Sequence, residues 1–301
     1  MKILVTGASG FLGSHLIPHL LKGGHRVGCL LRARSALKRE LAALPHWVVG
    51  DEGSGFRGAL GSFMPEMVVH LAAHYVTEHR YADIGVLVRS NVLFGAYLLE
   101  AMREVGCDAM VYAGTSWQHY RDQEYGPANL YAATKQAFST LAEFYQDAAG
   151  LRLLELHLYD SYGENDLREK LTNTLKIFAG SADKLLMSKG EQHIHLVHVD
   201  DLSRGIAMAC EQLHGFKAGE RRVYRLPSDQ AISVRQLVAL FNAIHPDRPV
   251  NVRWGERPYR AREIFQPWEA ADILPGWRPT IDLPTGLRRL YTHRCQAPQK
   301  S

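Results

Sequence analysis

Short apolar runs alternate with longer amphipathic stretches through the first half of the chain. The runs are too short for helices and read as buried strands, whereas the longer stretches have helical periodicity. Strands that alternate with helices imply right-handed crossovers and a parallel, doubly wound α/β sheet. We expect strands at residues 2–5, 25–31, 47–49, 67–71, 109–113 and 151–159, and helices at 15–22, 86–105 and 131–149.

The alternation loosens after Gly163, where proline, tryptophan and arginine become more frequent. Residues 196–199 and 223–226 are candidates to return to the sheet. The predicted organisation is therefore a dinucleotide-binding domain of the Rossmann type, residues 1–163 and 196–227, and a smaller substrate-binding lobe, residues 164–195 and 228–301.

Composition places the chain among ordinary folded proteins. Of its 301 residues, 46% are hydrophobic and 22% are charged, and the net charge of +4 is too small for a dedicated nucleic-acid binder. Basic residues are concentrated after residue 220. This excess suits an anionic ligand, although a solvated basic face is the commoner explanation.

The cysteines and apolar runs indicate a cytoplasmic protein. The four cysteines are widely spaced and lack a metal-binding pattern, so we expect neither a disulfide framework nor a metal site. The N-terminal apolar run is shorter than a signal-peptide core, and no uninterrupted run is long enough to span a membrane.

A glycine-rich turn follows the first predicted strand and opens the first helix. Gly7 permits a tight turn, Gly10 lets backbone approach a pyrophosphate, and Gly13 permits close packing of the helix. Amides at the start of that helix would hold the negative charge. In this context the triplet predicts a dinucleotide site, whereas alone it is only a turn.

The end of the second predicted strand favours NADP(H) over NAD. An acidic residue usually binds the ribose hydroxyls of NAD there, but this chain has Arg32, whose guanidinium matches a 2′-phosphate. The alternative is that Arg32 is a solvated surface charge. Asp51, after the third strand, is a candidate acceptor for the adenine amino group or an ordinary loop aspartate.

Three polar residues form a candidate catalytic set. Tyr131 and Lys135 lie four residues apart on one helix face, so the lysine charge can stabilise a phenolate. Ser116, or the neighbouring Thr115, follows a strand end where a hydroxyl can reach the same reacting oxygen.

These motifs together resemble the extended short-chain dehydrogenase/reductases, also called the NAD-dependent epimerase/dehydratase family of nucleotide-sugar enzymes. The resemblance covers nearly the whole chain. Its motifs are Thr6–Gly13, His70–Ala73, Asn91, the Ser116, Tyr131 and Lys135 set, Tyr159–Gly163, His198–Leu202 and Gly276–Pro279.

The resemblance implies a role for each matching residue. Tyr131 would be the general acid/base, Lys135 would bind the nicotinamide ribose and tune Tyr131, and Ser116 would hydrogen-bond the substrate oxygen. Cofactor contacts would come from Ser9, Phe11, Leu12, Leu71, Ala72, Ala73 and Tyr159. Because many relatives form dimers through two helices of the cofactor domain, a homodimer is also expected.

Departures from the family pattern narrow the activity. Family 4,6-dehydratases carry an acidic pair where this chain has Trp117 and Gln118, so a dehydratase would lack its acid and base. The usual contacts to the substrate pyrophosphate are changed at Asp160 and at Ile194 and His195. We expect Arg168, Lys170, Arg260 and Arg262 to replace them.

The resemblance is strongest to reductases that act on CDP- or dTDP-linked 4-keto-6-deoxy sugars with NADPH. The alternatives are a 4-epimerase that retains NAD, which Arg32 disfavours, and a non-catalytic NADP-binding sensor or assembly subunit. His74 and Gln118 follow strand ends and are candidates either to touch the sugar or to pack within loops.

Overall fold

The computed structural model describes residues 1–33, 35–50 and 52–292. These form two compact units. The first contains residues 1–158, 202–226 and 268–277, and the second contains 159–201, 227–267 and the chain from 278 onward. These boundaries differ from the predicted ones, because 268–277 lies in the first unit and 159–163 and 196–201 lie in the second.

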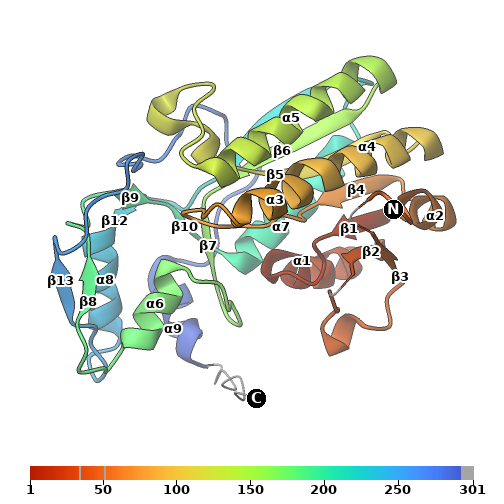
Figure 1. Cartoon of the computed structure of the whole chain (residues 1–301). Helices are drawn as coiled ribbons and strands as arrows, with labels where there is room; N and C mark the ends of the chain where they lie inside the picture. Colours follow the sequence, from red (N-terminus) through yellow and green to blue (C-terminus); the bar gives the residue numbers. More distant parts are fainter. Residues whose placement is uncertain (34, 51, 293–301) are drawn as a thin grey trace. The chain divides into compact units, whose positions relative to one another are not determined.

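A seven-stranded sheet forms the centre of the first unit (Figure 1). All six of its strand pairs are parallel, which confirms the predicted doubly wound fold. The strand order is β11-β6-β5-β4-β1-β2-β3, so the direction of winding reverses between β1 and β4. The strands are β1 (Lys2–Thr6), β2 (Arg26–Arg32), β3 (His46–Val49), β4 (Met67–His70), β5 (Ala109–Thr115), β6 (Arg152–Leu158) and β11 (Arg221–Leu226).

Helices cover both faces of this sheet. Figure 1 shows α4 and α5 on one side and α1 and α7 on the other. Leu98 and Met102 of α4 and Phe138 of α5 join the buried apolar cluster with side chains of the central strands. The helices are α1 (Phe11–Lys22), α2 (Phe56–Phe63), α3 (Asp83–Val88), α4 (Phe94–Val105), α5 (Leu130–Ala149) and α7 (Val199–Leu213), with a π-helical turn η2 (Arg89–Leu93) between α3 and α4.

Two predicted elements differ in the structure, and one helix was not predicted. The first helix begins at Phe11 rather than at residue 15, because Gly10 in extended conformation starts it directly after the turn. Helix α2 was not predicted, since its two glycines break the apolar pattern. Leu196–His198 forms β10, which pairs with β7 (Asp160–Tyr162) and not with the main sheet. The prediction that this segment returns to the main sheet was therefore wrong.

The second unit has its own core around Phe241, Leu237 and Leu175. Each of its strands pairs with one partner only among the described residues. Its remaining elements are α6 (Leu171–Phe178), α8 (Val234–Ile244), α9 (Leu283–Thr292), β8 (Leu185–Met187) with β13 (Val252–Trp254), and β9 (His193–Ile194) with β12 (Ile232–Ser233).

The stretch Asp83–Val105 is long and apolar enough to cross a membrane. One side of this stretch packs within the first unit, where Leu87, Phe94 and Leu98 are buried, whereas Ile84, Val88 and Leu93 are exposed. Core packing therefore accounts for part of its apolar composition.

Candidate active site

The glycine turn after β1 is too crowded for side chains. A Cβ on Gly7, whose φ is +72°, would lie 2.7 Å from the amide nitrogen of Ala72. A Cβ on Gly13 would lie 2.2 Å from the carbonyl oxygen of Gly7. The turn closes with a 3.0 Å hydrogen bond from Gly10 N–H to the same carbonyl. Both positions therefore require glycine, for the packing reasons that the sequence suggested.

Helix α1 starts in this turn. Gly10 is its N-cap, and none of the described side chains makes a capping hydrogen bond there. Because a helix start combines backbone amides with a partial positive charge, the segment suits a phosphate group. Ser9, Phe11 and Leu12, which we predicted around the pyrophosphate, lie within or beside this first turn.

The ends of β1 and β4 are joined at the point where strand order reverses. Thr6 Oγ1 lies 2.7 Å from His70 Nδ1 and accepts a 3.2 Å hydrogen bond from the amide of Ala72. Leu71 and Ala73 flank Ala72 in the segment that follows β4. The predicted cofactor residues of both segments thus lie at the carboxyl edge of the sheet, where open α/β sheets bind ligands.

Arg32 is the last residue of β2 and belongs to the same edge. Its guanidinium Nη1 donates a 2.8 Å hydrogen bond to Ser90 Oγ in η2, which holds the half-buried side chain in place. Asp51, the predicted adenine contact, lies outside the described residues.

Tyr131 and Lys135 occupy the first two turns of α5. Asn129 caps this helix, since its side-chain oxygen accepts from the amide of Ala132 at 2.9 Å. Lys135 is 2% exposed. Its ammonium nitrogen lies 4.2 Å from the centre of the Tyr112 ring, a cation–π contact.

Burial controls the charge of Lys135. Removal from water lowers its pKa to about 7, although the negative charge of Glu155 acts in the opposite direction. A lysine tuned in this way changes its charge near neutral pH. This property suits a group that stabilises a phenolate one helical turn away.

The turn after β5 carries the two candidate hydroxyls. Thr115 Oγ1 accepts a 3.3 Å hydrogen bond from the amide of Trp117, and Gln118 Oε1 accepts a 2.9 Å bond from the amide of Thr115. The Thr115 oxygen thus accepts within a capping box and keeps its own hydrogen to donate, so Thr115 and Ser116 both stay candidates for the reactive hydroxyl. Gln118 is fully buried and bonds Gln136, so its place is within the turn rather than at an open substrate surface.

His74 is held by a residue whose role the sequence left open. The side chain of Asn91 accepts from the amide of His74 at 2.7 Å and donates to its carbonyl at 3.0 Å. Asn91 also donates to Thr134 on α5 at 2.8 Å. Asn91 therefore fixes the segment after β4 beside the helix that carries Tyr131. Tyr75, which packs edge-on against Tyr131 with ring centres 5.1 Å apart, was also missed.

The other predicted ligand residues belong to the second unit. Lys170 and Asp160 form a 2.8 Å ion pair, and Arg168 binds both carboxylate oxygens of Asp166 at 2.7 Å. Tyr159 is buried against His195, whereas Arg260 is exposed. The roles proposed for these residues with the cofactor or substrate stay predictions.

Comparisons with known proteins agree with this geometry. Residues 3–224 match the family described as the NAD dependent epimerase/dehydratase family. The chain is 26% identical to CDP-abequose synthase of Yersinia pseudotuberculosis, over 88% of this chain and 90% of that protein. It is 30% identical to dTDP-glucose 4,6-dehydratase of Streptomyces griseus, over 79% and 76%.

The structure is also similar to solved structures. The UDP-glucose 4-epimerase of Thermus thermophilus in complex with NAD superposes with a TM-score of 0.80 and 25% identity, over 97% of this chain and 98% of that one.

The depressed pKa of Lys135 predicts a pH-dependent stability in the cofactor-free protein. In the folded state Lys135 loses its proton near pH 7, whereas an unfolded lysine keeps it to about pH 10.4. Between these values the unfolded state binds more protons, so stability rises with pH. We expect Lys135→Met to be more stable than wild type at pH 7, by on the order of a few kcal/mol, and this advantage to shrink toward pH 10.

Urea unfolding of both proteins at pH 7, 8.5 and 10 measures this difference. An advantage that stayed constant across the three values would contradict a depressed lysine pKa.

Proposed function

The chain belongs to the NAD-dependent epimerase/dehydratase family, and on that premise we propose that it is an NADPH-dependent reductase. Its substrate is a 4-keto-6-deoxy sugar linked to CDP or dTDP. The observation that carries the cofactor choice is Arg32, held at the end of β2 by Ser90, where a 2′-phosphate can pair with its guanidinium.

The catalytic steps follow from the residues of the first unit. Bound NADPH supplies the hydride that reduces the keto carbon. Tyr131 donates a proton to the ketone oxygen, and Ser116 donates a hydrogen bond to the same oxygen. Lys135 stabilises the resulting phenolate because its ammonium lies one helical turn away in a buried position.

The substrate class rests on the relatives. Their names refer to CDP-, dTDP- and UDP-linked sugars, which supports a nucleotide sugar. Trp117 and the enclosed Gln118 stand where the family's 4,6-dehydratases carry an acidic pair. Loss of water from the sugar is therefore disfavoured, which leaves carbonyl reduction and epimerisation as the candidate reactions.

A nucleotide-sugar 4-epimerase is the second candidate. Several similar proteins bear that name, among them the UDP-glucose 4-epimerase of Corynebacterium glutamicum, which is 27% identical over 82% of each chain. An epimerase regenerates its cofactor in every turnover and has no need to select the phosphorylated form. A non-catalytic sensor is the weakest alternative, because it would not need Ser116, Tyr131 and Lys135 together.

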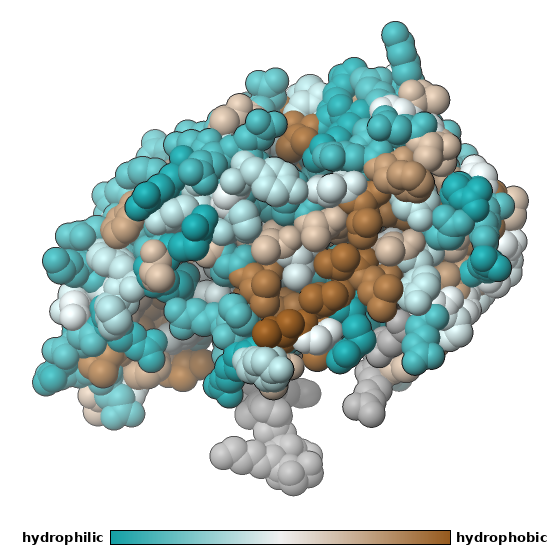
Figure 2. Space-filling view, turned by 45° about the horizontal axis from the view of Figure 1, so that its top comes forward, coloured by the Kyte–Doolittle hydropathy of each residue, from teal (hydrophilic) through white to brown (hydrophobic). Residues whose placement is uncertain are grey.

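We propose a homodimer through the helical face of the first unit. Ile84, Val88 and Leu93 of α3 and η2 are exposed apolar residues, and Phe144 on α5 is 63% exposed. Figure 2 views the molecule from the side on which these helices lie and shows apolar residues gathered there. A second copy of the chain would cover this face, and a solution mass of twice 33.8 kDa supports it.

Reduction and epimerisation differ in how much cofactor they consume. We expect the wild type to use one NADPH for each molecule of product when it is given a CDP-linked 4-keto-6-deoxyhexose. Tyr131→Phe, which lacks the proton donor, should lower turnover by about two orders of magnitude or more. Absorbance of NADPH is followed beside chromatography of the sugar. Sugar conversion without matching NADPH loss would favour the epimerase.

Arg32→Ala tests the cofactor choice. Removal of the guanidinium should weaken the binding of NADPH at least about tenfold, or about 1.4 kcal/mol, because only NADPH carries the 2′-phosphate. The affinity for NADH should stay within about twofold. Arg26→Ala is the matched control, since Arg26 lies on the same strand at its opposite end. Equal losses of affinity for both cofactors would show that Arg32 does not discriminate between them. Calorimetric titration of wild type and the two variants gives all six affinities.

A further inference from the structure

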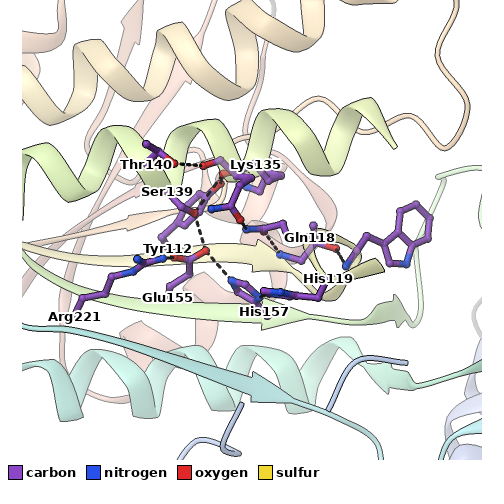
Figure 3. Close-up of polar contacts among 12 residues, drawn as sticks. Tyr112, Gln118, His119, Lys135, Ser139, Thr140, Glu155, His157 and Arg221 are labelled. Atoms are coloured by element: carbon purple, nitrogen blue, oxygen red, sulfur yellow. Dashed lines mark hydrogen bonds and ion pairs between the residues drawn. The ribbon is translucent and has the colours of Figure 1, made fainter. Parts of the chain in front are cut away.

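Two histidines and a glutamate form an unbroken chain of hydrogen bonds inside the first unit (Figure 3). His119 Nε2 lies 2.8 Å from His157 Nδ1, and His157 Nε2 lies 2.7 Å from Glu155 Oε1. At the other end, His119 Nδ1 lies 3.1 Å from the carbonyl oxygen of Gln123. Glu155 is fully buried, and His157 is 2% exposed.

Both ends of this chain are acceptors. The carbonyl of Gln123 carries no proton. Glu155 is held as a carboxylate, because Arg221 donates to its Oε2 at 2.8 Å and Ser139 donates to its Oε1 at 2.7 Å.

Counting protons then fixes the charge of the histidine pair. Three hydrogen bonds between two acceptor ends require three N–H groups, whereas two neutral imidazoles supply only two. The pair must therefore hold one additional proton. The hydrogen positions follow from the partners of each nitrogen.

The additional proton belongs on His157. Both of its nitrogens then donate, Nε2 to Glu155 and Nδ1 to His119. His157 is the ring that contacts the carboxylate, so the positive charge lies on His157, and His119 is neutral and donates from Nδ1 to Gln123. The ring of Trp268 stacks on His119 with a centre distance of 3.7 Å, which fixes the ring plane.

Other ionisable groups surround this chain on every packed element. Arg221 on β11 also pairs with Glu143 on α5, so the positive charges of His157 and Arg221 balance the two carboxylates. Ser139 lies one helical turn after Lys135. Figure 3 shows the facing ionisable groups Lys135 on α5, Tyr112 on β5 and Arg221 on β11, and Glu143 on α5 pairs with Arg221.

The histidine chain ends in the segment that begins with Ser116. Two interior side chains of this segment anchor it: Gln118 bonds Gln136 on α5 at 2.9 Å, and His119 bonds His157 on β6. Ser116 lies three residues before His119. A shift of His119 therefore moves the turn that presents the Ser116 hydroxyl.

We propose that protonated His157, clamped by Glu155, is a positioning residue that fixes the Ser116 turn through His119. The proton itself is required, because a neutral pair leaves two acceptors facing each other or breaks the bond to Gln123. The role in turnover rests on the proposed reductase function, whereas the protonation does not.

The protonation is tested by nitrogen NMR on cofactor-free protein with ring-labelled histidines at about pH 8, where exposed histidines are neutral. We expect one ring with both nitrogens protonated, assigned by its loss in His157→Gln. In Glu155→Gln the amide can donate to His157 Nε2, so the chain persists with both rings neutral and the doubly protonated signal disappears. A neutral His157 in the wild type, or a signal that survives in Glu155→Gln, would overturn the proposal.

The positioning role is tested by His119→Phe, which keeps an aromatic ring against Trp268 but removes both ring nitrogens. We expect kcat to fall at least about tenfold with the KM for NADPH within about twofold. Tyr125→Phe is the matched control, because it removes the contact of Tyr125 with Thr140 from the same segment at the surface. The kcat of Tyr125→Phe should stay within about twofold of the wild-type value.

A pH profile separates positioning from general structural damage. Because Lys135 loses its proton at alkaline pH in both proteins, the informative quantity is the ratio of the wild-type kcat to the kcat of His119→Phe. This ratio should fall toward one at alkaline pH as the shared proton leaves the wild type. An equal loss at all pH values, or a His119→Phe rate like that of Tyr125→Phe, would contradict the role. If the wild type does not reduce CDP- or dTDP-linked keto sugars, the proposed function fails, and the NMR result still decides the protonation.

Discussion

The reversal of strand order between β1 and β4 is the constraint on which the candidate site depends. Crossovers leave in opposite directions from these two strands, so the segments after them separate and open the carboxyl edge of the sheet. Thr6 and His70 join the two strand ends by a buried hydrogen bond. Because Gly7 packs against the backbone of Ala72 at the same point, the strand ends determine how closely a dinucleotide can approach.

Burial of polar groups beside this edge determines its chemistry. Lys135 lies on Tyr112 with its pKa lowered to about 7, and Glu155 lies beneath it in a network with His157 and Arg221. An unpaired charge would be costly in this interior, so each charged group of the network has a partner. These contacts hold the side chains that the proposed reaction uses in fixed positions.

Much of this arrangement was predictable from local sequence. The glycine turn, Arg32 and the Tyr131 and Lys135 pair each follow from spacing within one strand or helix, and the doubly wound sheet follows from the alternation of elements. Contacts between distant segments were not predictable, because nothing local indicates that His119 meets His157 or that Gln118 turns inward to Gln136. The short β10 was misassigned for the same reason, since an apolar run does not reveal its partner strand.

Calorimetric titration of NADPH against two glycine variants tests most directly whether this edge binds the dinucleotide. A Cβ at Gly13 would lie 2.2 Å from the Gly7 carbonyl, whereas a Cβ at Gly58 in α2 meets no heavy atom within 4 Å. We predict that Gly13→Ala, with its circular dichroism unchanged, binds NADPH at least about tenfold more weakly, or about 1.4 kcal/mol, than wild type. Gly58→Ala should bind like wild type. A folded Gly13→Ala that bound NADPH as tightly as Gly58→Ala would contradict the account.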